Sequence, residues 1–204
     1  MDPLTVPKDD VERFQAALLS DGVGLFPADT VYGLAADAES EAGVRRLYEL
    51  KGRPERKPAA VMFFELDRAL AALGDVGPRT RRAIERLLPG PVTLILPNPG
   101  RLFPLACGPA PERLGVRVPD VPEAMRAIHR PVLQSSANPS GGPDPRRLAD
   151  VDQAIRAGVD VELDGGELPG TPSTVVDLVA YESSGAYEVL REGALPVDTL
   201  TELL

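Results

Sequence analysis

The sequence predicts an α/β fold in which helices cover the faces of a mixed β-sheet. In the first half of the chain, apolar residues at helical spacing alternate with short apolar and β-branched runs typical of buried strands. The second half is richer in strand and turn patterns. The 22 prolines and 19 glycines are spread along the 204 residues, so we expect short connections and a single domain over residues 1–204.

The first predicted elements lead into a basic segment. Residues 9–20 have apolar positions at helical spacing, and residues 23–26 form an apolar run typical of a buried strand. Residues 27–34 set polar side chains among apolar ones and are predicted to be a loop. Ser40 can cap a second helix that ends near residue 51. The remaining predicted strands are 59–64, 92–96, 114–118, 132–135, 159–163, 174–179 and 187–190, and the remaining predicted helices are 67–73, 78–88, 123–129 and 197–204.

The composition argues against several classes of protein. A net charge of -9 disfavours extended wrapping of nucleic acid, which depends on a basic face, but leaves room for a local basic pocket. The single cysteine, Cys107, excludes an internal disulfide and a multi-cysteine zinc site. No run approaches about eighteen apolar residues, and the N-terminus lacks the pattern of a signal peptide. We therefore expect a cytoplasmic protein.

Common catalytic motifs are absent from the sequence. There is no G-x-x-x-x-G-K-[ST] phosphate loop, no G-x-G-x-x-G after a strand and no G-x-S-x-G. His129, the single histidine, lies in a polar helical stretch where a surface position is expected. Cys107 is expected to fill a small buried space. The chemistry must therefore rest on other residues, and no protein metal site is predicted.

A basic corner lies at residues 50–58, where a predicted helix ends and a predicted strand follows. Lys51, Arg53 and Lys57 supply the charges, while Gly52 and Pro54 turn the chain. The rigid fork of Arg and the mobile point charge of Lys together suit a polyphosphate. Cations are also common at helix C-termini because the helix dipole favours them there.

Polar and charged residues also recur near the ends of predicted strands. Arg117 lies in a run otherwise typical of a core, although an edge strand facing water would also accept it. Ser136 and Asn138 follow one strand in a turn that is also common for local reasons. Ser173 precedes another strand, and Arg191 ends a third. If these groups converge on the ends of one sheet, they suit phosphoryl or nucleotidyl transfer, which needs placement and charge neutralisation.

Seven short motifs resemble those of the YrdC family and occur in the family's order between about residues 20 and 194. They are PADTVYGL at 27–34, KGRP at 51–54 with KP at 57–58, PGPVTL at 89–94, RVP at 117–119, SANPSG at 136–141, STVVD at 173–177 and LREG at 190–193. Each motif is short, but seven in order make the resemblance specific.

The resemblance implies a twisted mixed sheet around a basic cavity. It also implies synthesis of L-threonylcarbamoyladenylate from L-threonine, bicarbonate and ATP, with release of pyrophosphate and with Mg²⁺ accompanying the ATP. The product would serve threonylcarbamoyladenosine modification of tRNA through a separate transferase. The implied site residues are Lys51 and Arg53 as catalytic residues, Arg53, Lys57, Ser136, Asn138 and Arg191 for ATP, and Thr30, Arg117, Gln134 and Ser173 for threonine.

Two alternatives remain open at the level of sequence. One is a non-catalytic, YciO-like relative that binds double-stranded RNA and acts in translation or ribosome assembly. The other is a different carbamoyl-adenylate chemistry, as in hydrogenase-maturation relatives. Ala28 and Met62 stand where the family usually has Thr and often has His. Pyrophosphate release with threonine supplied or withheld separates these alternatives.

Overall fold

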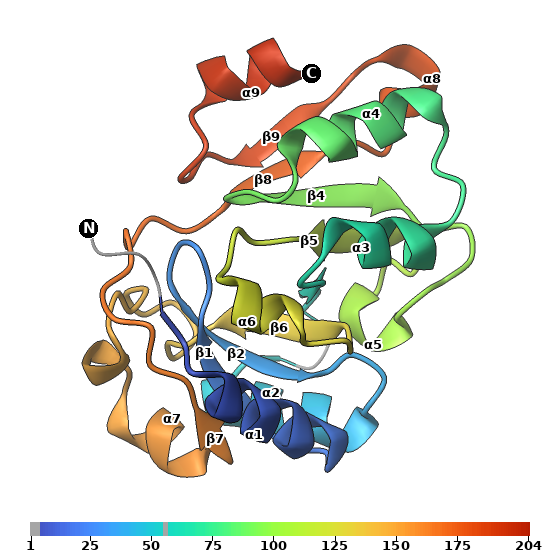
Figure 1. Ribbon diagram of the computed structural model, residues 1–204. Coiled ribbons are helices and arrows are strands. Elements are labelled where there is room, and N and C mark those ends of the chain that lie inside the picture. Colours follow the sequence, from blue (N-terminus) through green and yellow to red (C-terminus); the bar gives the residue numbers. More distant parts are fainter. Residues whose placement is uncertain (1–4, 55–56) are drawn as a thin grey trace.

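The computed structural model describes residues 5–54 and 57–204, and these residues form a nine-stranded sheet with helices on both faces (Figure 1). The strand order is β7-β1-β2-β6-β3-β5-β4-β8-β9. The strands are β1 Gly24–Pro27, β2 Tyr32–Asp37, β3 Ala60–Met62, β4 Val92–Pro97, β5 Arg113–Arg117, β6 Val132–Ser136, β7 Val161–Glu162, β8 Thr174–Asp177 and β9 Glu188–Arg191. The pairs β1–β7, β3–β5 and β4–β8 are parallel and the others antiparallel, which confirms the predicted mixed sheet.

The helices are mostly short. They are α1 Lys8–Leu19, α2 Glu41–Lys51, α3 Leu66–Leu73, α4 Pro78–Leu87, α5 Pro104–Cys107, α6 Glu123–Arg126, α7 Gln153–Gly158, α8 Tyr181–Ser184 and α9 Val197–Leu203, with a 3-10 turn at Leu148–Asp150. Ser40 caps α2 as expected, because its hydroxyl accepts a hydrogen bond from the Gly43 N–H at 2.9 Å. No helix within residues 5–54 or 57–204 has the length and apolar character needed to cross a membrane.

Alternate residues of the strands pack into two cores on opposite faces of the sheet. In β2, Leu34 and Ala36 join a core with α2 and α4, whereas Ala35 joins a second core with α1 and α6. Successive strand side chains point to opposite faces, so the two cores lie on either side of the sheet. The second core covers only part of its face, around β1, β2 and β3.

The prediction of a loop over residues 27–34 is wrong in its second half. β2 begins at Tyr32, and all six of its residues are buried. A strand covered on both faces shows no alternation of polar and apolar residues, and glycine and alanine within it weaken the strand signal. The short helices α5, α7 and α8 carry too few turns for a periodic pattern, and the sequence did not predict them.

Candidate functional site

A cavity of about 560 Å³ lies on the part of the second face that helices leave open. In β5, Arg113, Gly115 and Arg117 line this cavity, while the intervening Leu114 and Val116 pack into the core on the other face. Gly115 pairs with Ala60 of β3, so small residues form the floor and leave room above the sheet. The volume falls within the range of small-ligand sites.

The polar residues converge on strand ends, as predicted: Arg117, Ser136 and Arg191 end β5, β6 and β9, and Ser173 directly precedes β8. From these ends the cavity extends over the face of the sheet to residues two apart along single strands. The sequence did not indicate this extension, because the register of neighbouring strands cannot be derived from one strand's own sequence.

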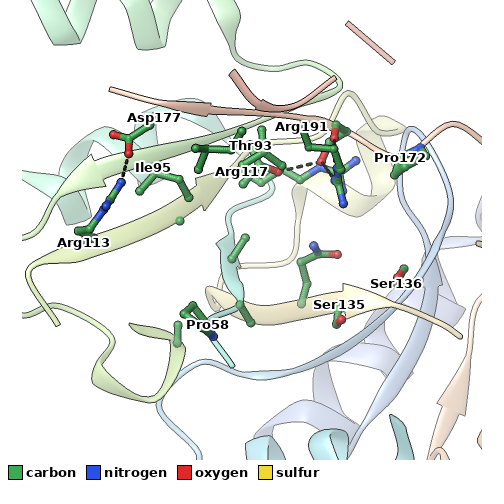
Figure 2. Close-up of a pocket in the computed structure, with 18 of the residues that line it drawn as sticks. Pro58, Thr93, Ile95, Arg113, Arg117, Ser135, Ser136, Pro172, Asp177 and Arg191 are labelled. Carbon is green, nitrogen blue, oxygen red and sulfur yellow. Dashed lines mark hydrogen bonds and ion pairs between the residues drawn. The ribbon is translucent and has the colours of Figure 1, made fainter. Parts of the chain in front are cut away.

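Figure 2 shows Thr93, Arg117 and Arg191 on one side of this cavity and Ser135 and Ser136 on the other. We define the Arg117 wall as Thr93, Arg117, Ser173 and Arg191, and the Arg53 wall as Arg53, Ser135 and Ser136.

Strand register brings the Arg117 wall together. Leu94 of β4 pairs with Val116 of β5, so Thr93 and Arg117, one residue beyond that pair, lie opposite each other. Thr93 in turn pairs with Val175 of β8, and Val175 pairs with Arg191 of β9. Residues distant in sequence therefore form one row across four neighbouring strands.

Arg117 is buried, with 3% of its surface exposed, and lies in a central strand. An edge position facing water is therefore excluded as the reason for its presence. Its Nη2 forms an ion pair with Asp29 and donates a 2.6 Å hydrogen bond to Thr30 Oγ1. Its Nε is buried and has no hydrogen-bond partner within the described residues. Buried guanidinium N–H groups are normally paired, so the unpaired Nε of a side chain that lines the cavity is a feature that packing alone does not explain.

Asp29 lies behind Arg117, in the turn between β1 and β2, and is absent from the residues that line the cavity. Besides the ion pair, its Oδ2 accepts a hydrogen bond from the Asp120 N–H at 3.2 Å. Burial raises the pKa of Asp29, and the charge of Arg117 opposes that effect. The two residues thus form a nearly buried ion pair in which Asp29 holds one edge of the guanidinium.

Ser173 links the other members of the Arg117 wall. Its hydroxyl and that of Thr93 are hydrogen-bonded at 2.9 Å, and its carbonyl accepts a 2.7 Å hydrogen bond from Arg191 Nη2. Burial lowers the pKa of Arg191, which Asp144 partly offsets and the nearby Arg117 reinforces. This wall therefore offers two guanidinium groups and two hydroxyls within one row.

Arg53 reaches the cavity because α2 ends at Lys51 and Gly52 turns the chain with φ 57°. That left-handed conformation favours glycine. The Arg53 guanidinium bonds to the carbonyl of Pro58, lies 5.6 Å from the centre of the Tyr48 ring, and has a long 3.4 Å contact with Ser135 Oγ. Its Nε is buried and unpaired within the described residues, and burial lowers the pKa of Arg53.

Lys51 lies behind the Arg53 wall rather than in the cavity. Its Nζ donates to the carbonyl of Ser136, to the carbonyl of Asn138 at 2.7 Å and to Asn138 Oδ1 at 3.0 Å. Ser140 also donates its N–H to the Lys51 carbonyl at 3.0 Å. Burial, followed by the charge of Arg53, lowers the pKa of Lys51 to about 8. Lys51 therefore fixes the turn that carries Ser136 and Asn138.

The structure brings six of the predicted site residues to the surface of one cavity: Arg53, Arg117, Gln134, Ser136, Ser173 and Arg191. Thr30, Lys51 and Asn138 lie one layer behind, each hydrogen-bonded to a residue of a wall or its turn. Lys57 is exposed and does not line the cavity. The residues meet as a group, although several support the walls and do not face the space.

Sequence reasoning missed Asp29, Thr93, Asp144 and the ion pair of Arg113 with Asp177, all of which line or support the cavity. The alternation Arg113, Gly115, Arg117 within a strand was a signal for a lined hollow, because two cations flank a residue with no side chain. The sequence offered no comparable signal for the contact of Asp29 with Arg117, which are 88 residues apart.

The residues set aside from catalysis lie as predicted. His129 is exposed, and Cys107 is buried in the cavity wall, where burial raises the pKa of its thiol. Among the described residues, no group of three or more His, Cys, Asp or Glu side chains could hold a metal ion. Ala28 and Met62, which differ from the family's usual residues, both belong to the second core.

Comparison with known proteins identifies the family of this chain. A threonylcarbamoyl-AMP synthase of Pyrococcus abyssi is 30% identical over 94% of this chain and 56% of that protein. One of Bacillus subtilis is 32% identical over 86% of this chain and 52% of that protein, so the chain spans about half the length of these curated relatives. The structure of P. abyssi Sua5 complexed with L-threonine matches with a TM-score of 0.86 at 28% identity, over 98% of this chain and 58% of that one. Residues 16–193 match the model Sua5_yciO_yrdC, described as telomere recombination, and the chain therefore belongs to the Sua5/YciO/YrdC family.

Proposed function

We propose that this chain synthesises L-threonylcarbamoyladenylate from L-threonine, bicarbonate and ATP and releases pyrophosphate. The observation that carries the proposal is the single cavity in which Arg53 and Arg191 face a shared space beside the buried Arg117. Such a cavity suits a polyphosphate next to a small carboxylate. The name of the relatives and the threonine complex of P. abyssi Sua5 support the same reaction.

In this proposal the triphosphate lies between Arg53 and Arg191. Ser136 lines the same space, and its hydroxyl donates a hydrogen bond to Asn138 Oδ1 within the turn that Asn138 and Lys51 support. Lys57, at the exposed end of the basic corner, meets the phosphates as they enter. Charge-assisted hydrogen bonds contribute roughly 1.5–3 kcal/mol each, so two or three of them account for much of the binding of a triphosphate.

Threonine would occupy the space beside Arg117. The guanidinium of Arg117 lines the cavity and would bind the carboxylate, while Asp29 and Thr30 hold its Nη2. Ser173 offers a hydroxyl nearby, and Gln134 lines the cavity beside Ala60. The buried Arg117 thus fixes the orientation of the amino acid relative to the nucleotide.

The reaction needs placement more than a side-chain nucleophile. The threonine amine and bicarbonate give an N-carboxylate and water, and the carbamate oxygen then attacks the α-phosphorus. The bond from the α-phosphorus to the bridging oxygen breaks, and pyrophosphate leaves with that electron pair. The carbamate is already anionic, so this attack requires no general base, and the arginines stabilise the negative charge as it spreads.

We propose that ATP enters as its Mg²⁺ complex. Mg²⁺ keeps most of its ligands from phosphate oxygens and water and often takes only one or two protein carboxylates. The residues present fit that mode, because Asp144 lines the cavity near Arg191. Within residues 5–54 and 57–204 its carboxylate forms no ion pair and no hydrogen bond. When bound, the ion would neutralise charge on the phosphates.

We further propose that a separate transferase passes the product to tRNA and that the reaction occurs in the cytoplasm, in keeping with the use of ATP. An RNA-binding role is less well supported. The net charge is -9, and the cations Arg53, Arg117 and Arg191 line a cavity of small-molecule size and not an extended surface.

The experiment is pyrophosphate release from Mg-ATP with L-threonine and bicarbonate supplied together or withheld one at a time, with the adduct identified by mass spectrometry. The proposal expects release that requires both. Release that ignores threonine, or a product mass that lacks the carbamoyl carbon, would reject it.

A further inference from the structure

We propose that Asp29 sets the charge selectivity of the cavity: by neutralising Arg117 from behind, it reserves that subsite for a singly charged carboxylate and excludes phosphate groups. The inference rests on the proposed function and adds a specificity-determining residue to it. The geometry that carries it is the juxtaposition of one guanidinium in an ion pair with two that form no ion pair within the described residues, around the same space.

The three arginines of the two walls differ in their partners. Arg117 forms an ion pair with Asp29, and both side chains are at least nine-tenths buried, with exposed fractions of 3% and 9%. Within residues 5–54 and 57–204, neither Arg53 nor Arg191 forms an ion pair with a carboxylate, and both bond to neutral oxygens instead. The positive charge of the cavity is therefore concentrated on Arg53 and Arg191.

Asp29 neutralises Arg117 without occupying the cavity. Its carboxylate pairs with Nη2 of Arg117, and Asp29 is absent from the lining residues. Arg117 itself lines the cavity, and its guanidinium remains there as a donor. A monoanionic carboxylate can use that donor at a site of nearly zero net charge, whereas a phosphate dianion would lose its hydration without a matching countercharge.

Discrimination between carboxylate and phosphate matters because threonine and ATP both carry anionic groups and their proposed subsites are adjacent. Arg191 and Arg117 are close enough for the charge of Arg117 to lower the pKa of Arg191. Without Asp29, the Arg117 subsite would carry the same positive charge as its neighbours, and phosphate oxygens would compete with the amino acid. We infer that Asp29 is a positioning residue for Arg117. The ligand that Arg117 then accepts is the α-carboxylate of an amino acid.

The test uses Asp29→Asn, which removes the charge with little change of shape, and Glu188→Gln as the matched control. Glu188 also lines the cavity, so the control makes the same change of one charge at a different place. Each protein is loaded with a non-hydrolysable ATP analogue, and threonine binding is measured by calorimetry against increasing inorganic phosphate. Circular dichroism establishes that each variant is folded.

We expect phosphate to leave threonine binding unaffected in the wild type and in Glu188→Gln. In Asp29→Asn, phosphate should displace threonine with an apparent affinity at least roughly tenfold above that of the wild type. A tenfold change in affinity corresponds to the contribution of one charge-assisted hydrogen bond. Equal phosphate sensitivity of Asp29→Asn and the wild type, or equal gains in both variants, would overturn the inference.

The wild type keeps the inference testable if Asp29→Asn fails to fold. Displacement of threonine by phosphate from the wild type would contradict it, and resistance to phosphate would support it. Failure of the proposed function is distinguishable, because it would appear as wild-type protein that binds no threonine at all.

Discussion

Replacement of Lys51 by methionine tests whether this lysine supports the site or binds phosphate directly. Met retains the length and apolar stem of Lys but cannot donate to the carbonyls of Ser136 and Asn138. Asn138 Oδ1 keeps its 2.6 Å hydrogen bond from Ser136 Oγ, so two buried carbonyl oxygens lose their partner. Each unpaired buried polar group lowers the free energy of unfolding by about 1–3 kcal/mol. The variant no longer buries an ammonium group, and this gain offsets part of the loss from the two carbonyl oxygens.

We therefore expect Lys51→Met to lower the free energy of unfolding by about 3 kcal/mol, measured by urea denaturation. For a chain of this size the same change lowers Tm by roughly 6–12 °C. Lys57→Met is the matched control, because Lys57 belongs to the same basic corner but is exposed, and its effect should stay within about 0.5 kcal/mol. A Lys51→Met protein as stable as the wild type that no longer binds ATP would refute this reasoning and make Lys51 a phosphate ligand.

Three further outcomes follow from the same geometry. Arg53→Ala should weaken ATP binding by roughly tenfold or more, and Lys57→Ala should weaken it by less. Circular dichroism should show that both variants are folded. Unchanged ATP affinity in both variants would mean that the cations of the basic corner only stabilise the end of a helix. Arg117→Ala should raise the threonine KM with little change in the ATP KM, and a change in ATP alone would contradict our division of the cavity. Because the pKa of Lys51 is lowered to about 8, its ammonium is lost as pH rises through that value, and two N–H groups then face three acceptors. ATP affinity measured by calorimetry should therefore fall between about pH 7 and 9, whereas a constant affinity would contradict the role of Lys51.

Features fixed by neighbouring residues were predictable from the sequence. Ser40 caps α2 and Gly52 ends it, so both ends of this helix and the position of the basic corner follow from local chemistry. The apolar spacing of α1 likewise predicted the residues that it buries, Val11, Phe14 and Leu18.

Features that depend on strand pairing were not predictable. The sequence indicated Arg117 as an unusual charge in a strand, but its neighbours Thr93 and Arg191 follow from the register of β5, β4, β8 and β9. Asp29 lies in a turn, where aspartate is common for local reasons, so its sequence position gives no sign of a special role. Only the folded chain brings Asp29 to Arg117. The sheet face that carries the cavity forms only when these distant strands pair.

The most direct test of the shared cavity is a crystal structure of this chain with L-threonine and a non-hydrolysable ATP analogue. The account predicts phosphates between Arg53 and Arg191 and the threonine carboxylate on the guanidinium of Arg117, within one continuous site. A nucleotide bound elsewhere on the molecule, or threonine bound away from Arg117, would contradict it.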